Sequence, residues 1–205
     1  MAGEDARAKE IAKEADGLPF YVTRDLSSAR TALRYFARGL RRAGIVCSAG
    51  AKRLRAEGLG AQVNGPDETV AWFLNRWPDV RASDALEVCA TEYSCQGLEL
   101  DAVGLAWGGD LIRESGGWEP YTFSGTNWQS VKQPDDRRFL MNTYRVLMTR
   151  ARYETVIWVP SGSNVTDSFF DKTRPAAEMD TIADYLLGCG ARKLEEMGCP
   201  EHTHD

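Results

Sequence analysis

Apolar residues follow two different periods along the chain, and the two periods alternate. Short runs rich in β-branched and aromatic residues predict buried strands at 18–22, 44–47, 86–90, 102–107 and 155–159. Apolar positions three or four residues apart predict helices at 26–40, 51–57, 68–75, 134–151 and 176–187. Strands that alternate with helices are typical of a mostly parallel sheet covered on both faces. The pattern therefore predicts an α/β fold with three layers, α/β/α.

The helix predicted at 26–40 separates apolar and basic positions. Asp25 can cap its amino end. The face expected to be buried consists of Leu26, Ala29, Leu33, Phe36, Ala37 and Leu40. Arg30, Arg34, Arg38 and Arg41 recur at spacings of three or four and share the opposite face, in a region without acids. This stripe is either a solvated helix face or a surface that tracks the phosphates of a nucleic-acid strand.

Residues 107–135 interrupt the alternation of strands and helices. The segment is rich in glycine, serine and tryptophan and contains Trp118, Tyr121, Phe123 and Trp128. We interpret it as an insertion that forms a β-hairpin, because turn residues separate short aromatic runs. Its aromatic side chains either close a small hairpin core, the interpretation that we favour, or stack on nucleic-acid bases.

Composition limits the class of protein. A chain of 205 residues is long enough for one domain with a core, and its net charge of −5 argues weakly against bulk attraction to nucleic acid. The five cysteines include no Cys-x2-Cys pair, which favours reduced thiols over a zinc site. No stretch approaches the roughly 18 apolar residues of a membrane span. We therefore expect a cytoplasmic protein with no membrane partner and no metal site.

Two polar loops join apolar segments in the second half of the chain. The first begins at Thr91 and contains Gln96-Gly97-Leu98-Glu99, and the second is Thr149-Arg150-Ala151-Arg152. This pair resembles motifs V and VI of superfamily 1 helicases, which lie in the second of two RecA-like domains. The resemblance implies a RecA-like sheet with helices on both faces.

Further segments narrow the resemblance. Ala106-Trp107, Asp110-Leu111, 142–147 and 171–175 follow in an order and spacing similar to the C-terminal half of a bacterial domain of unknown function. That family is also described as a Schlafen-group-3-like DNA/RNA helicase domain. The likeness implies a second RecA-like helicase domain at 18–190, with the insertion at 107–135. Residues 1–17 are then a flexible or helical lead-in, and 191–205 a polar tail that includes His202 and His204.

The resemblance also implies roles for single residues. Arg150 matches the arginine finger of motif VI, and a planar, permanently charged guanidinium suits the negative charge that builds during phosphoryl transfer. Glu99 matches the acid that accepts hydrogen bonds from the ribose hydroxyls. Gln96 and Gly97 match the loop that couples nucleotide state to the nucleic-acid strand.

Three further positions complete the implied site. Thr91 matches a residue that contacts backbone phosphate, and Arg152 is either a structural ion-pair partner or a contact to the nucleic-acid strand. The motif IV arginine of many superfamily 1 helicases has no counterpart at Cys47 or Ser48. Arg53 or Lys52 is the candidate replacement.

The sequence contains no Gly-x4-Gly-Lys-Ser/Thr and no apolar strand that ends in Asp-Glu. ATP and Mg²⁺ would therefore bind only when a P-loop RecA-like domain, from the same gene or a split gene, completes the site. We expect this chain alone to be inactive as an ATPase and to work with single-stranded DNA or RNA. The alternative is a non-catalytic nucleic-acid-binding or scaffolding remnant. A self-sufficient hydrolase has little support, because the sequence has no Gly-x-Ser-x-Gly and no internal histidine for a triad.

Overall fold

The computed structural model describes residues 2–14 and 18–197, and its centre is a seven-stranded sheet. All pairings within that sheet are parallel. From one edge to the other the strands are β10 (Arg192–Lys193), β1 (Phe20–Thr23), β9 (Ala151–Trp158), β5 (Leu100–Ala106), β2 (Ala43–Cys47), β4 (Val88–Thr91) and β3 (Ala61–Gln62). The predicted α/β class with a mostly parallel sheet is confirmed.

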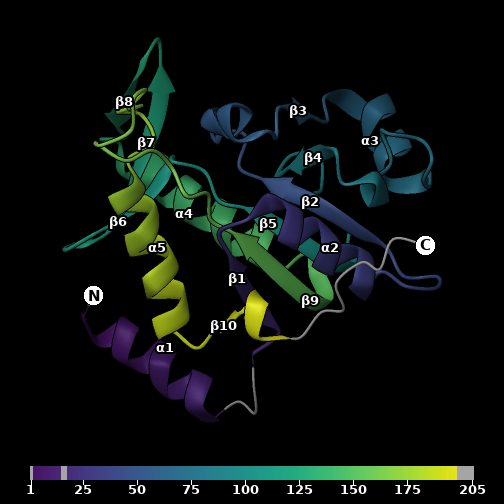
Figure 1. Cartoon of the computed structure of the whole chain (residues 1–205), viewed down its shortest axis with the longest axis horizontal. Coiled ribbons are helices and arrows are strands. Elements are labelled where there is room, and N and C mark those ends of the chain that lie inside the picture. The colour runs from purple at the N-terminus through teal and green to yellow at the C-terminus, as the bar shows by residue number, and fades with distance from the viewer. Residues whose placement is uncertain (1, 15–17, 198–205) are drawn as a thin grey trace.

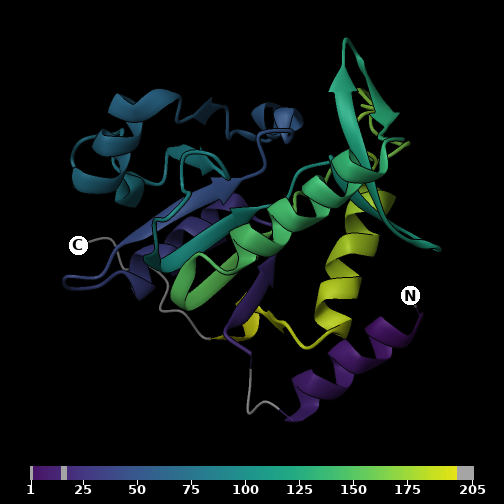
Figure 2. The same cartoon turned by 180° about the vertical axis from the view of Figure 1, so that it is seen from behind.

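Helices cover both faces of the sheet. Figure 1 shows α2 (Leu26–Phe36) across one face, and Figure 2 shows α4 (Pro134–Met148) across the other. The remaining α-helices are α1 (Ala2–Glu14), α3 (Gly65–Leu74) and α5 (Ala176–Gly188). Leu33 of α2 packs with Ile45, whereas Leu147 of α4 packs with Val46, the next residue along β2. Successive side chains of a strand point to opposite faces, so the two apolar cores follow from the unbroken apolar runs of the strands.

The insertion forms a small antiparallel sheet of its own. Its strands are β6 (Leu111–Glu114), β7 (Gly117–Ser124) and β8 (Asn127–Ser130), in that order. The predicted hairpin is therefore present, with one strand more than a single hairpin needs. Phe123 and Trp128 pack edge to face with ring centroids 4.9 Å apart. This pair closes the hairpin, in agreement with the packing role that the sequence favours.

The helix predicted at 26–40 ends earlier than its periodicity suggests. Asp25 caps the amino end as expected, because its carboxylate accepts a 2.6 Å hydrogen bond from the Ser28 backbone N–H. The helix stops at Phe36, and Gly39 follows with a φ of +77°. Leu40 is consequently 98% exposed, and its predicted place on the buried face is wrong. The segment predicted as a helix at 51–57 is the 3-10 helix η1 (Lys52–Glu57), which Gly58 ends in a left-handed conformation as expected.

The predicted polar tail begins with folded residues. Strand β10 pairs with β1, and Leu194 in the 3-10 helix η3 (Leu194–Met197) is 4% exposed. Pairing by Arg192 and Lys193 needs only backbone groups, so their polar side chains conceal the strand from a hydrophobic pattern. His202 and His204 lie outside the described residues. Over the helices that the structure describes, none has both the length and the apolar character that a bilayer crossing requires.

Candidate nucleotide and nucleic-acid interface

The segment that resembles motif V runs from the carboxyl end of β4 to the amino end of β5. Buried Cys95 anchors its middle, and the Cys95 N–H donates a 2.9 Å hydrogen bond to the Thr91 carbonyl. Gly97 has a φ of +76°, a conformation in which a side chain is strained. Gln96 and Gly97 are exposed at this turn. The sequence therefore builds a tight turn whose backbone and amide side chain face outward just before β5.

Arg150 lies at the junction between α4 and β9. Its backbone carbonyl accepts a 3.1 Å hydrogen bond from the Leu100 N–H, and its Nε donates a 3.0 Å bond to the Val146 carbonyl. The side chain is half-buried, and no carboxylate of the described residues lies within ion-pair distance of it. The guanidinium is thus held at its base while its outer nitrogens are available for an anion.

Glu99 and Arg152 form an ion pair across β5 and β9. Arg152 Nε lies 3.2 Å from Glu99 Oε2, and the two side chains are 60% and 57% exposed. Leu100, which follows Glu99, and Ala151, which precedes Arg152, are register partners in the two neighbouring strands. An exposed pair of this kind contributes about 0–1 kcal/mol, so a ligand can separate it at small cost. Arg152 therefore forms an ion pair, one of the two roles considered for it, and its contact to a nucleic-acid strand stays a prediction.

Arg150 lies at the amino edge of the sheet. Open α/β sheets usually place ligands at the carboxyl edge. Arg150 instead precedes the first residue of β9, and Glu99 precedes the first residue of β5. Because all strands are parallel, both residues lie at the amino edge. The helix runs antiparallel to the strands, so its carboxyl end returns the chain to the edge where the next strand begins.

Arg53 and Thr91 lie at the opposite, carboxyl edge. Arg53 in η1 forms an ion pair with Asp171, and its guanidinium carbon lies 5.5 Å from the Phe123 ring centroid. Thr91 is 6% exposed, and its hydroxyl lies 3.3 Å from the Ser94 hydroxyl. The structure thus brings Glu99, Arg150 and Arg152 to the amino edge, and Gln96 and Gly97 lie in the loop that leads there from Thr91. Arg53 lies apart from them, in η1 after β2.

Arg53 belongs to an ion cluster that fixes the loop before α5. Arg174 pairs with Glu57 and contacts Asp171 at 3.0 Å. Hydrogen bonds from Thr173, Arg174 and Arg53 hold the pKa of Asp171 well below its usual range, against the opposing effect of burial. The cluster connects the loop after β2 to the segment that leads into α5. In this structure the charge of Arg53 is therefore balanced by Asp171, and its role as a nucleotide contact stays a prediction.

The predicted arginine stripe on α2 divides into unlike parts. Arg30 donates to the Leu86 carbonyl at 3.0 Å and pairs with Glu87 at 2.9 Å. Arg34 is exposed on the helix. Arg38 lies beyond the helix end, with its guanidinium carbon 4.3 Å from the Tyr35 ring centroid. The expectation that one helical face carries the whole stripe is wrong, because α2 ends at Phe36.

Arg41 of the predicted stripe lies at the amino edge, a location that sequence periodicity did not predict. Arg41 precedes β2, and its guanidinium carbon lies 4.5 Å from the ring centroid of Tyr153 in β9. We call Arg38, Arg41, Arg150 and Arg152 the amino-edge arginines. Acidic residues at this edge are Glu99, Asp101 and Glu154. In the sequence, each of these arginines stands just before a strand or just after a helix. In a parallel sheet, such positions lie at the amino edge.

The carboxyl edge of the sheet also contains a buried carboxylate that the sequence pattern did not single out. Asp110 is fully buried in the loop after β5, and its Oδ1 accepts a 2.7 Å hydrogen bond from the Tyr144 hydroxyl. Burial raises the pKa of Asp110. The chain leaves the neighbouring strands β2 and β5 in opposite directions here. After β2 it runs toward β3, an edge strand, and after β5 it runs toward the side of β9. Open α/β sheets place ligands at such a point, and here a Cβ added to Gly50 would lie 2.7 Å from Asp110 Oδ2.

One of three comparisons with known proteins found a match. A model of the family described as Schlafen group 3, DNA/RNA helicase domain, matches residues 1–161 of the 205. No curated protein and no solved structure gave a match to the chain. The match spans β1 to β9, and so includes both polar loops and the amino-edge arginines. The chain belongs to the Schlafen group 3 DNA/RNA helicase domain family.

Proposed function

We propose that the chain is the second RecA-like domain of a superfamily 1-like helicase or nucleic-acid-dependent ATPase. The observation that carries the proposal is Arg150, a half-buried residue with no carboxylate within ion-pair distance among the described residues. An arginine without an acidic partner can bind a phosphate without first breaking an ion pair. A P-loop domain that docks against the amino edge would bring a phosphate to it.

The residues near Arg150 fit the remaining parts of a nucleotide. Glu99 leaves its exposed pair with Arg152 at little cost and can then accept hydrogen bonds from ribose hydroxyls. The turn at Gly97 lies beside the start of β5 and can respond to closure of the two domains. Bound ATP supplies the γ-phosphoryl group, and the P-loop domain supplies the cradle and the Mg²⁺ ligands. Arg150 would stabilise the charge that develops on transfer.

Contacts to single-stranded DNA or RNA would come from two groups. The amino-edge arginines supply phosphate contacts. Tyr93 in the motif V segment stacks on Phe139 of α4 with ring centroids 6.3 Å apart, and the two residues are 63% and 49% exposed. Exposed aromatic rings offer stacking surfaces that accept any base. This surface connects the nucleic acid to the same segment that ends at Glu99.

The test joins this chain to a P-loop RecA-like domain of the same family and measures nucleic-acid-stimulated ATP hydrolysis. Arg150→Ala should lower kcat by roughly 10³-fold or more, with a much smaller change in nucleotide affinity. Arg138 is exposed on α4, so Arg138→Ala is the matched control and should retain activity. If Arg150→Ala unfolds the domain while activity per folded molecule survives, Arg150 is structural and the motif VI assignment is wrong.

A non-catalytic nucleic-acid-binding or scaffolding module is the second candidate. It is favoured by the pairing of Arg53 with Asp171 and of Glu99 with Arg152, which satisfies these charges without a nucleotide. The same joined protein separates the candidates. Binding of single-stranded nucleic acid without stimulated ATP hydrolysis would favour the second.

A further inference from the structure

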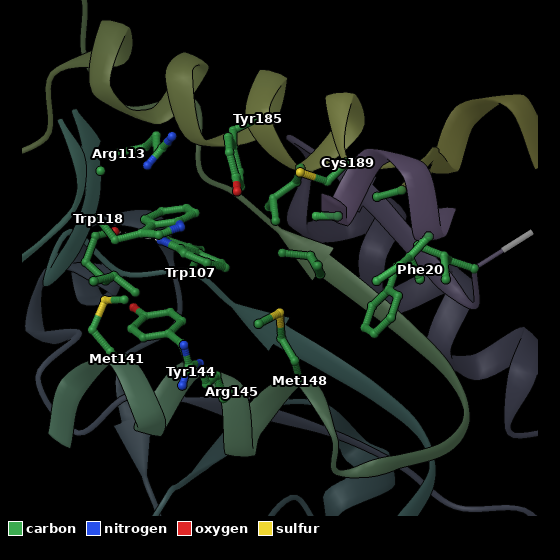
Figure 3. Close-up of a pocket in the computed structure, with 18 residues that line it drawn as sticks. Phe20, Trp107, Arg113, Trp118, Met141, Tyr144, Arg145, Met148, Tyr185 and Cys189 are labelled. Atoms are coloured by element: carbon green, nitrogen blue, oxygen red, sulfur yellow. Dashed lines mark hydrogen bonds between the residues drawn. The ribbon is translucent and has the colours of Figure 1, made fainter. Parts of the chain in front are cut away.

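A cavity and a groove in this structure differ in how their aromatic walls are held. The cavity of Figure 3, about 570 Å³ in volume, lies between α4 and α5. Its rings pack on one another: the centroids of Trp107 and Tyr144 lie 4.4 Å apart, and those of Trp118 and Tyr185 lie 5.2 Å apart. The rings of this cavity are therefore engaged with their neighbours. The groove lies beside α2, which covers the opposite face of the sheet, and its one aromatic residue is largely exposed.

The groove lies at the amino edge of the sheet, between the carboxyl end of α2 and the segment before β4. Its volume is about 490 Å³, within the roughly 300–1,000 Å³ typical of small-molecule sites. Apolar lining comes from Ala37, which follows α2, Ala43, which begins β2, and Leu86, which precedes β4. We call it the α2 groove. Arg38 and Arg41, which lie between α2 and β2, are at the same edge.

Trp77 is the aromatic residue of the α2 groove. It is 66% exposed, and in the part of the chain that the structure describes no other aromatic ring packs on it. Its backbone is held in place, because the Trp77 N–H donates a 2.9 Å hydrogen bond to Asp84 Oδ1. An indole that is anchored at its backbone and open to solvent offers a surface on which a planar ring can stack.

The charges around the α2 groove favour an anion. Every carboxylate of residues 76–87 already has an arginine partner: Asp79 pairs with Arg81 at 2.8 Å, Asp84 with Arg76 at 3.0 Å and Glu87 with Arg30 at 2.9 Å. Arg34 lines the groove and is exposed. Over residues 2–14 and 18–197, no carboxylate lies within ion-pair distance of Arg34. Its guanidinium can therefore bind an anion without first breaking an ion pair.

We propose that the α2 groove holds one nucleotide, with its base stacked on Trp77 and its phosphate at Arg34. Stacking on an aromatic side chain accepts any base, and a guanidinium matches the geometry of a phosphate. The nucleotide is free or is one unit of a single strand, and we expect a strand, because Arg38 at the same edge can take a neighbouring phosphate. The inference rests on the proposed function for the kind of ligand, and it adds the place where one base is held.

The experiment measures binding of the full chain to two labelled oligonucleotides of equal length. One carries thymine at every position, and the other is abasic, so it keeps the phosphates and lacks the bases. Fluorescence anisotropy gives both affinities at several salt concentrations. Competition with thymidine monophosphate separates the two sources of the nucleotide. Equal affinity per nucleotide assigns the groove to a free nucleotide, whereas tighter binding of the strand assigns it to a nucleic acid.

Matched variants locate the site. Trp77→Ala should lower affinity for the thymine strand about tenfold and leave the abasic strand unchanged, since stacking of one base contributes on that scale. Trp77→Phe keeps a ring and should retain most of the binding. Arg34→Gln should reduce the slope of log affinity against log salt by about 0.7 for both strands. Phe169→Ala and Arg138→Gln, at exposed residues outside the groove, should change neither quantity, and circular dichroism checks that each variant is folded.

Three results would each overturn the proposal: an equal effect of Trp77→Ala on both strands, an unchanged salt slope in Arg34→Gln, or no binding of either strand to the folded chain. The α2 groove and the proposed function can also fail separately. If the protein joined to a P-loop domain shows strand-stimulated hydrolysis that needs Arg150, while Trp77→Ala leaves strand affinity unchanged, the groove alone is rejected. If Trp77 and Arg34 control strand binding while Arg150→Ala leaves hydrolysis unchanged, the proposed function alone is rejected.

Discussion

The Tyr144 hydroxyl joins α4 to the loop after β5 through Asp110. It donates a 2.7 Å hydrogen bond to Asp110 Oδ1 and accepts a 3.1 Å bond from the Gly108 N–H. Tyr144 is 1% exposed and Asp110 is fully buried. One hydroxyl thus serves two buried groups, and the helix that it fixes is the one that ends beside Arg150. The position of the proposed arginine finger therefore depends on a polar contact far from the amino edge.

We predict that Tyr144→Phe destabilises the domain. The change leaves the buried Gly108 N–H without its acceptor and removes one of the donors to buried Asp110, which costs about 1–3 kcal/mol of unfolding free energy. Urea denaturation measures the loss. Tyr121→Phe is the matched control, because the Tyr121 hydroxyl bonds exposed Glu114 and water can replace it. Equal effects of the two changes would contradict the proposed role of burial.

We predict that the unfolding free energy of the Asp110→Asn variant increases, relative to that of the wild type, as pH rises. Burial raises the folded-state pKa of Asp110 above its unfolded value, so its contribution is fully present below the unfolded pKa. That contribution is lost as pH rises through the raised pKa, because the unfolded state releases its proton at a lower pH than the folded state. Asparagine cannot titrate and avoids the loss.

The measurement is the unfolding free energy of both proteins at about pH 4 and about pH 8. The difference, variant minus wild type, should increase between the two values. Glu92 also has a pKa raised by burial and by Asp110, and it is present in both proteins. A Glu92→Gln background therefore provides the control. A difference that stays constant with pH would show that Asp110 does not titrate in this range.

Most of the fold was predictable because its strands are continuous apolar runs. The segments around Ile45, Val103 and Ile157 are buried on both faces, which only the centre of a parallel sheet requires. The end of α2 was not predictable from periodicity, because Ala37 and Leu40 continue the apolar spacing after the helix stops. Strand β10 was missed because its pairing uses backbone groups and its side chains are polar.

The candidate site was predictable by residue type but not by location. Motif resemblance identified Glu99 and Arg150 as related residues, and the structure brings both to the amino edge. It also linked Arg53 to them, although Arg53 lies at the other edge in an ion pair with Asp171. Sequence spacing does not reveal which edge a loop residue occupies until strand direction and order are known.

We predict that Gly97→Ala destabilises the turn at the end of the motif V segment. The φ of +76° costs a residue with a Cβ about 1–2 kcal/mol, although no atom lies within 4 Å of the position that the Cβ would take. Gly97→Asn should cost less, because asparagine tolerates the left-handed region. Gly116→Ala, in a turn without positive φ and with open space, serves as the control. Thermal unfolding of the three variants measures the order, and an alanine effect no larger than that of asparagine would contradict it.

The last prediction separates the two parts of the original arginine stripe. Arg30 is bonded to Glu87 and to the Leu86 carbonyl, and its side chain is 20% exposed. Arg38 and Arg152 lie at the amino edge with exposed side chains, and the exposed pair of Arg152 with Glu99 separates at small cost. If the amino edge contacts single-stranded nucleic acid, Arg38→Gln and Arg152→Gln should each weaken binding. Each should also reduce the slope of log affinity against log salt by about one unit. Arg30→Gln is the matched control, since it removes the same charge from the α2 face and should affect stability more than the salt slope. Fluorescence anisotropy of labelled single strands at several salt concentrations measures all three variants. An unchanged slope for Arg38→Gln and Arg152→Gln, with a reduced slope for Arg30→Gln, would move the nucleic-acid surface from the amino edge to the face of α2.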